Sequence, residues 1–304
     1  MELNHVAVFV DNLEKATLGP ALGGWAGEAI SISAQPVIVN GRPAEHSGRT
    51  RRIRTANPAF GVSVEDVAPG APIQPIPGHA WHHVAVWCDD ILASVHALEE
   101  SGYTRDIVGR GPNGKLATFA YMISDSGPRL ELADAAIRSR FLQHAAEQQE
   151  RADAAGQSRC AVLSAPLLPD HVTAVVETMD DLEALTACWR QAFKAEWEEV
   201  VEEAITVITV QGARELRTCR IRTLGYPYLA ILVPSVESRA LLAPVGGHGW
   251  HHVGFRTGNL ALDVALLEAS GFRREFFHQG RNGQIGSFAM MVAPEGTRIR
   301  LLSA

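Results

Sequence analysis

The sequence has few cysteines, and no arrangement of them carries chemistry. There are four in 304 residues, and no two stand in a Cys-x-x-Cys pair. Because zinc knuckles and disulfide frameworks need characteristic cysteine spacings, the sequence indicates neither. We expect reduced thiols at all four positions, which are Cys88, Cys160, Cys188 and Cys219.

The sequence also lacks a basic surplus and a long apolar run. Lys and Arg total 27 against 34 Asp and Glu, giving a formal net charge of -7 at pH 7, whereas a nucleic-acid surface needs a basic stripe. No apolar stretch reaches membrane-spanning length, and no signal-peptide pattern follows Met1. We expect a cytoplasmic protein that acts on a small-molecule substrate, with no nucleic-acid or membrane partner. We expect the one basic cluster to be a solvated strand or loop, and it comprises Arg49, Arg51, Arg52 and Arg54.

What the chain does contain is an internal repeat. Residues 75–133 align with residues 244–302 without a gap, from PIPGHAWHHVAVWCDD against PVGGHGWHHVGFRTGN to PRLELA against TRIRLL. Self-similarity of this kind indicates a duplicated structural unit. One aligned position reverses its charge, because Glu131 of the first copy is Arg300 in the second.

The same succession of strand and helix signals occurs in the repeated segment and, more weakly, elsewhere in the chain. A β-branched run, HVAVFV (5–10) or HHVAVW (82–87), leads into an acidic start and an amphipathic stretch. Strand candidates separated by turn residues follow, including ATFAYMI and PRLELA after the turn GRGPNG (109–114). The unit is β-α-β-β-β. Two weaker copies complete four modules, at residues 1–70, 75–135, 165–240 and 244–304.

The modules predict two domains, since a chain of this length can form two separate cores. We expect an N-terminal domain over residues 1–135 and a C-terminal domain over residues 161–304. The segment 136–160 is rich in Ala, Gln, Glu and Arg. It is expected to be a helical linker, anchored at its first turns and solvated later.

Alternation along the strands predicts a metal site in the N-terminal domain. Successive side chains point to opposite faces of a strand, so the valines of HVAVFV and HHVAVW pack while His5 and His83 face the concave side. On the closing strands, the same rule turns Glu65 and Glu131 toward that side. Imidazole and carboxylate ligands suit a divalent first-row metal. We therefore predict a site formed by His5, Glu65, His83 and Glu131.

The sequence resembles the vicinal oxygen chelate superfamily, most strongly at NHVAVFVDNLEKA, WHHVAVWCDD and PRLELAD. This superfamily includes glyoxalase I, methylmalonyl-CoA epimerase, the type I extradiol dioxygenases and the fosfomycin- and bleomycin-resistance proteins. The resemblance covers nearly the whole chain. It implies an α+β fold of two tandem domains, each built from two β-α-β-β-β modules that form a curved mixed sheet cup.

The resemblance also implies roles for the four residues. It makes His5, His83 and Glu131 metal ligands, and Glu65 the additional acid of the glyoxalase pattern. That pattern ends in Glu-Leu-x-x-Pro, whereas this chain has EDVAP at 65–69. Extradiol enzymes use two His and one Glu, usually in the second domain, so the quartet resembles glyoxalase I or methylmalonyl-CoA epimerase more closely.

The second pair of modules departs from this pattern. His171 and His252 are retained, but we place Ala230 and Arg300 at the positions of the two acids. Because guanidinium groups repel a divalent cation, we predict no metal in the C-terminal domain. The basic cluster there is either an anion site or a set of internal salt bridges, and it comprises Arg256, Arg298 and Arg300.

Other residues in the repeats are expected to be structural. Trp81 and Trp250 occur in both copies, including the one without a predicted metal, so packing explains both. The remaining histidines of these motifs are interpreted in the same way, namely His79, His82 and His248.

The predicted function is that of a metal-dependent lyase or isomerase, glyoxalase- or epimerase-like. A divalent ion (Zn, Ni, Co, Mn or Fe) would stabilise an enolate or enediolate of a small organic substrate, and Glu131 or Glu65 would move the proton. One alternative is an Fe(II)-dependent extradiol-type dioxygenase, and another is a non-catalytic small-molecule binding or resistance protein. A homodimer is left open. An apolar or aromatic part of the substrate is suggested by Phe9, Trp87, Phe119 and Tyr121.

Overall fold

The fold is that of a computed structural model of the chain. The structure describes residues 1–57, 59–76, 81–110, 116–125, 127–155, 162–163, 165, 167–246 and 248–304. His79, Cys160 and most of the turn expected at 109–114 lie outside these residues.

The first half of the chain forms two modules of four strands each. The first contains β1 (Glu2–Val10), η1 (Leu13–Lys15), α1 (Leu18–Leu22), β2 (Ile30–Val39), β3 (Arg42–Ile53) and β4 (Gly61–Val67). The second contains β5 (His83–Cys88), α2 (Ile91–Glu100), β6 (Thr104–Arg110), β7 (Leu116–Ser124) and β8 (Gly127–Asp134). They are followed by η2 (Ala135–Ile137) and α3 (Arg138–Ala154).

The second half repeats this order. Its first module contains β9 (Leu168–Val175), α4 (Met179–Phe193), β10 (Val201–Thr209), β11 (Gly212–Arg222), β12 (Tyr228–Pro234) and η4 (Val236–Ser238). Its second contains β13 (His252–Thr257), α5 (Leu260–Ala269), β14 (Arg273–Gln279), η5 (Arg281–Gly283), β15 (Ile285–Val292) and β16 (Arg298–Ser303). The predicted β-α-β-β-β order is confirmed in both halves, whereas the domain boundaries remain predictions.

Local signals explain where the repeated helices begin and end. The Asp90 side chain accepts a hydrogen bond from the Ala93 backbone N–H at 3.0 Å, which caps the start of α2. The chain leaves α2 through Gly102, whose φ of 88° favours glycine. Asn259 and Gly271 occupy the same places around α5. The two copies of the repeat therefore carry the same start and stop signals.

The helical part of the first module is shorter than its sequence pattern predicts. The amphipathic stretch forms only η1 and the five-residue α1. A Cβ on Gly19 would lie 2.3 Å from the Trp25 ring, so this segment is held close to the indole. It is also held from its other end, because the Glu295 carboxylate accepts hydrogen bonds from the Thr17 hydroxyl and the Leu18 N–H. Tertiary contacts limit this helix more than its composition does.

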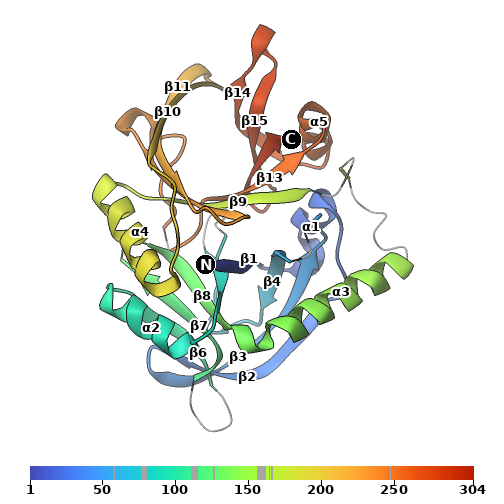
Figure 1. The fold of residues 1–304 in the computed structure, drawn as a ribbon. Coiled ribbons are helices and arrows are strands. Elements are labelled where there is room, and N and C mark those ends of the chain that lie inside the picture. Colours follow the sequence, from blue (N-terminus) through green and yellow to red (C-terminus); the bar gives the residue numbers. More distant parts are fainter. Residues whose placement is uncertain are drawn as a thin grey trace.

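Each half closes its strands into a barrel (Figure 1). The first barrel has the order β1-β4-β3-β2-β6-β7-β8-β5, and the second has β10-β11-β12-β9-β13-β16-β15-β14. In each barrel the first strands of the two modules pair antiparallel, as β1 with β5 and β9 with β13. The predicted α+β fold of two similar halves, each built from two modules, is confirmed, and the cups expected from the sequence are closed barrels.

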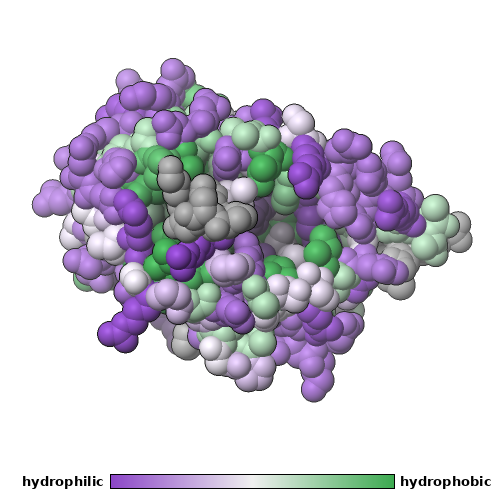
Figure 2. Space-filling model, turned by 90° about the horizontal axis from the view of Figure 1, so that it is seen from below, coloured by the Kyte–Doolittle hydropathy of each residue, from purple (hydrophilic) through white to green (hydrophobic). Residues whose placement is uncertain are grey.

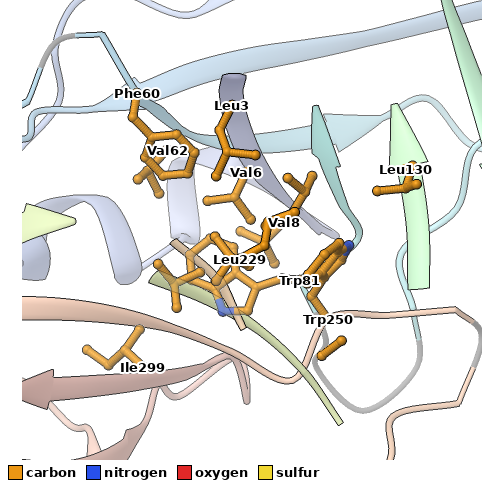
Figure 3. Close-up of a cluster of buried hydrophobic side chains, with 14 of the residues drawn as sticks. Leu3, Val6, Val8, Phe60, Val62, Trp81, Leu130, Leu229, Trp250 and Ile299 are labelled. Atoms are coloured by element: carbon orange, nitrogen blue, oxygen red, sulfur yellow. The ribbon is translucent and has the colours of Figure 1, made fainter. Parts of the chain in front are cut away.

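The barrels pack against each other through the outer faces of these central strands. Val6 and Val8 of β1 belong to one buried core cluster with Leu229 of β12 and Ile299 of β16. Figure 3 shows these residues around Trp81 and Trp250. The cluster also takes in apolar side chains of α2, α4 and α5. The valine faces therefore pack against the other barrel as well as against helices.

The two tryptophans make reciprocal contacts across this junction. Trp81 and Trp250 form a β-bridge, and both side chains are fully buried. The indole N–H of Trp81 donates to the Arg298 carbonyl and that of Trp250 to the Arg129 carbonyl, each at 2.8 Å. Packing is confirmed as the role of both residues.

Helix α3 lies along the first barrel (Figure 1) and contributes residues to the wall of its cavity. Its first turns are anchored by Phe141, whose ring centroid lies 5.7 Å from that of Trp87. Its later turns are also held, because Ala152 is buried and Asp153 pairs with Arg54 at 3.4 Å. The later turns therefore contact the barrel at these points, while most of their other side chains are exposed or partly exposed. No helix in the described part of the chain is long and apolar enough to cross a membrane.

Candidate metal centre

Strand pairing places three of the four predicted ligands together inside the first barrel. His5 of β1 lies opposite Ala85 of β5, and Ala85 is in register with Glu131 of β8. His83 precedes Ala85 by two residues and so shares its inward face. The small Ala85 leaves space between the longer side chains. Alternation along β1, β5 and β8 therefore carries the site, as the sequence predicts.

The ligand atoms are close to one another. Nε2 of His5 lies 3.1 Å from Nε2 of His83, and Oε2 of Glu131 lies 3.3 Å from the first and 3.0 Å from the second. Ligands about 2.1 Å from one ion are separated by about 3.0 Å in neighbouring octahedral positions and about 3.4 Å in tetrahedral ones. The three observed separations fit ligands on one face of an octahedron. Within the described residues, this is the one His/Cys/Asp/Glu group with such convergence.

The protonation states also suit a metal. Burial alone would raise the pKa of Glu131, but the hydrogen bonds with His5 and His83 outweigh it and lower that pKa to about 2. Burial lowers the pKa of His83 to about 4, and the contact with Glu131 opposes this only in part. At neutral pH the site therefore offers a carboxylate and a neutral imidazole, the forms that bind a divalent ion.

A second layer of polar side chains orients His83. Nδ1 of His82 lies 2.9 Å from Nδ1 of His83, and the other ring nitrogen of His82 contacts Nη1 of Arg129. Arg129 in turn pairs with Asp106 at 2.8 Å. A partner of this kind fixes the ring orientation of a ligating imidazole. His82, which we expected to be structural, thus supports the ring of His83.

The repeat itself contains the signal for this second layer. The equivalents of Asp106, Arg129 and His82 are Glu275, Arg298 and His251. Arg298 pairs with Glu275 at 3.0 Å, as Arg129 does with Asp106. Both copies thus retain the supporting acid, the arginine and the His-His pair, although only the first copy has the ligating acid, Glu131. Comparing the copies position by position would have identified it.

Glu65 lies in the same barrel but outside the group of three. It is in register with Phe9 on β1 and does not belong to the cluster of ligand atoms that lie within 4.8 Å of one another. Burial, followed by the charge of Glu131, raises the pKa of Glu65 to about 8, while a hydrogen bond from Thr50 acts in the opposite direction. At neutral pH Glu65 is therefore a carboxylic acid and not a carboxylate.

A cavity of about 310 Å³ gives access to the site. His5 and Glu65 lie in its wall, and apolar side chains make up much of the rest. On the underside of the molecule, where the first barrel lies, hydrophobic residues gather around a hollow in an otherwise largely hydrophilic surface (Figure 2). Further wall residues come from β3 and its flanks (Arg52, Ile53, Arg54), from the segment before β4 (Phe60), and from α3 (Phe141, His144, Gln148).

The aromatic residues suggested by the sequence lie in two places, beside His83 inside the barrel and against helix α3. Tyr121 and Phe9 are buried inside the barrel, with ring centroids 4.8 Å and 6.1 Å from that of His83. Phe119 lies beside Tyr121 with a centroid distance of 5.6 Å. Trp87 contacts α3 through Phe141. The aromatic side chains in the cavity wall are Phe60 and Phe141, which the sequence analysis did not connect with the site.

The second barrel holds two histidines but a different set of charges. Nε2 of His171 and His252 lie 3.4 Å apart, and Nδ1 of His171 lies 2.6 Å from Asp170. The Arg300 guanidinium stacks over the Phe288 ring with its carbon 4.0 Å from the centroid.

Internal salt bridges account for two of the three predicted arginines. Arg256 pairs with Asp170 at 2.6 Å, and Arg298 pairs with Glu275. The register also corrects one position, because Leu232 and not Ala230 corresponds to Glu65.

Comparisons with known proteins agree with the architecture. The chain matches no protein-family model and no curated protein sequence. Among solved structures it is similar to a mutant of 4-hydroxymandelate synthase from Streptomyces coelicolor, with a TM-score of 0.58 and 14% identity over 99% of this chain and 92% of that one. It is also similar to 2,2',3-trihydroxybiphenyl 1,2-dioxygenase from Sphingomonas wittichii strain RW1, with a TM-score of 0.53 and 11% identity over 100% and 90%.

A third similar structure is a 2,3-dioxygenase from Pseudomonas sp. KL28, with a TM-score of 0.52 and 12% identity over 100% of this chain and 92% of that one. In all three the match extends over nearly the full length of both chains. At this level of identity the likeness establishes the fold.

Proposed function

The chain has the fold of the vicinal oxygen chelate superfamily, and we propose that its first barrel is the active site of a metal-dependent enzyme. The observation that supports this most directly is the spacing of His5, His83 and Glu131, at 3.0 to 3.3 Å between ligand atoms. Three ligands on one face leave other coordination positions for a substrate. When bound, a divalent ion there supplies a Lewis acid that stabilises negative charge on a substrate oxygen.

The two acids of the barrel have different roles in this proposal. Glu131 is held by two imidazoles and stays ionised, with a pKa of about 2, so it serves as a ligand. Glu65 has a pKa of about 8, which lies near the pH at which an enzyme works. A group of that kind accepts and returns a proton efficiently. Glu65 is therefore the proposed proton carrier, and the reaction is an isomerisation or a lyase reaction at carbon next to a carbonyl.

A second candidate is an Fe(II)-dependent dioxygenase of the extradiol type. It is favoured by the composition of the group, because two histidines and one carboxylate on one face are typical of non-haem iron oxygenases. Glu65 lies outside the ligand group in both candidates, but in this second reaction it would not be needed to carry a proton to and from carbon. The two candidates therefore share the metal site and differ in the use of Glu65.

Metal analysis with two assays separates these candidates. The first candidate predicts that the purified protein contains Zn, Ni, Co or Mn and exchanges the proton next to the carbonyl of 2-oxo acids or hydroxyketones in D2O, followed by NMR. Glu65→Gln should keep the metal and lose at least about 100-fold in exchange rate. Bound iron with oxygen uptake on catechols would support the second candidate. A protein that binds no divalent ion contradicts both.

A further inference from the structure

Arg52 places a positive charge in the wall of the cavity. On β3 it is in register with Ser63 of β4, which is itself in register with Ala7 of β1. These positions face the barrel interior, as His5 does two residues before Ala7. The guanidinium lies over Gly61, where a Cβ would be 2.4 Å from Nη2. The basic cluster expected to be solvated thus contributes two members, Arg52 and Arg54, to the cavity wall.

This guanidinium has no anionic partner among the described residues. No ion pair includes it, and its buried Nη1 has no hydrogen-bond partner. Burial lowers the pKa of Arg52 to about 10, and no neighbouring acid opposes the shift. Its guanidinium makes a cation–π contact with the Phe141 ring, whose centroid lies 5.1 Å from the guanidinium carbon. Arg52 is partly buried, and a charge withdrawn from water without a counter-charge is destabilising, so such a group is typically retained with a partner.

Other charged groups in the cavity wall do not supply that partner. Arg54 is itself a cation, and its own partner Asp153 lies 3.4 Å from it. Glu65 also lies in the wall, and no ion pair joins its carboxyl group to Arg52. Glu28 is exposed and forms no ion pair with Arg52. One positive charge therefore remains unbalanced beside the apolar wall.

In the second barrel the equivalent arginine has partners within the chain. Arg222 is in register with Ala230, as Arg52 is with Ser63, so the two arginines are equivalent. Arg222 pairs with Glu198 at 2.5 Å. It also stacks over the Tyr228 ring at 4.5 Å. Both contacts belong to the same barrel and leave no unbalanced charge.

Both partners are missing in the first barrel. The N–H of Glu198 donates to the Arg222 carbonyl at 2.9 Å, and the N–H of Ala26 donates to the Arg52 carbonyl at the same distance, so Ala26 replaces the acid. Tyr228 is in register with His171, whereas Gly61 is in register with His5, so glycine replaces the tyrosine. The first barrel therefore lacks both the acid and the ring that contact the equivalent arginine in the second barrel.

We propose that Arg52 binds a carboxylate of the substrate in the first barrel. One unbalanced charge matches a monoanion, and a guanidinium binds a carboxylate through two parallel hydrogen bonds. The apolar side chains of Ile53, Phe60 and Phe141 line the same cavity and would contact a hydrophobic part of that molecule. As a statement about substrate, this rests on the proposed function, but anion binding can be measured without metal or turnover.

The test is calorimetric titration of full-length protein, freed of metal by chelation and dialysis, with phenylacetate and its neutral isostere phenylacetamide. Wild type should bind the acid about tenfold to a hundredfold more tightly than the amide. Arg52→Met should remove this preference, and so should Ala26→Glu, which introduces the acid found at Glu198. Arg222→Met removes the equivalent guanidinium from the second barrel and should leave the preference unchanged.

Equal binding of acid and amide by wild type would overturn the proposal, and so would a preference that survives in both Arg52→Met and Ala26→Glu. Circular dichroism of each variant checks that it is folded, and two variants of opposite chemistry guard against a folding defect in one. Metal content of the untreated protein is measured separately. If the protein does not bind the carboxylate, the proposed metal site is unaffected. If it does not bind metal, the titration still tests the role of Arg52.

Discussion

Positions 131 and 300 occupy the same place in the two barrels and have opposite charges. Glu131 is the acceptor for two imidazoles, while Arg300 stacks on the ring of Phe288. Burial lowers the pKa of Arg300 to about 10, so it is charged at neutral pH. A cation there repels a divalent ion directly. We therefore propose that this difference in charge contributes to metal binding in the first barrel and to its absence from the second.

Glu65 makes the stability of the metal-free protein depend on pH. Its pKa is about 8 in the folded protein and near the ordinary 4.5 when unfolded. The folded state therefore holds a proton that the unfolded state releases between these values, and the free energy of unfolding falls as pH rises through this window. In Glu65→Gln this fall should be absent.

Urea unfolding in chelator at pH 5 and pH 8 checks this. The variant should gain at least about 1 kcal/mol relative to wild type between the two pH values. A difference between variant and wild type that stays constant with pH would show that the acid ionises normally. The same variant should keep its bound metal, because Glu65 lies outside the ligand group.

At the scale of elements, helix α3 completes the cavity of the first barrel. Phe141, His144 and Gln148 lie in the cavity wall. Phe141 contacts both Trp87 and the guanidinium of Arg52. The segment between the two halves of the chain is therefore part of the proposed substrate site.

Phe141→Ala tests the contribution of this helix. Because the ring is only partly buried, truncation should lower the free energy of unfolding by about 1–2 kcal/mol, less than for a fully buried phenylalanine. It should also weaken phenylacetate binding, since the cavity loses an apolar contact. Urea unfolding and calorimetry measure these effects, with the exposed α3 residue Gln143→Ala as control. Unchanged binding in Phe141→Ala would exclude α3 from the site.

Elements with a strong local pattern were predictable, and docking between elements was not. The period of two along β1 and β5 determines which face His5 and His83 share, so these residues could be assigned from sequence. The contacts of α3 depend on where the helix docks on the barrel, which its own composition does not encode. The same is true of Arg52, whose surroundings come from three different elements.

Glu65, the fourth predicted ligand, shows what alternation along a strand can and cannot predict. Alternation correctly turns Glu65 inward, but its distance from Glu131 depends on the curvature of the closed barrel. The position equivalent to Glu65 in the second barrel is Leu232, not Ala230, because the module over 165–240 is too weakly similar to fix the register without the strand pairing.

At the scale of the whole molecule, the two barrels share one core. Buried residues of both halves belong to a single cluster, with Trp81 and Trp250 at its centre (Figure 3). Each indole donates to a carbonyl of the other half, on Arg298 and Arg129. Those arginines also carry the second polar layer of each barrel. Through Arg129 and His82, the junction between the barrels is therefore connected to the side chain of His83.

Trp81→Ala tests whether this junction stabilises the whole chain. Loss of a fully buried indole and its hydrogen bond should lower the free energy of unfolding by about 3–5 kcal/mol. Val236→Ala, at a side chain with 74% exposure, should change it by less than about 0.5 kcal/mol. Urea unfolding followed by circular dichroism measures both. A loss below about 1 kcal/mol in Trp81→Ala would mean that the barrels are stable without this contact.

The central claim is that the first barrel holds a metal through His5, His83 and Glu131, and that the second does not. The most direct measurement is metal content per chain, by mass spectrometry, in wild type, Glu131→Arg and His252→Ala purified in parallel. The account predicts one divalent ion in wild type and in His252→Ala, and none in Glu131→Arg, with circular dichroism unchanged. Retention of the ion by Glu131→Arg, or its loss from His252→Ala, would contradict the account.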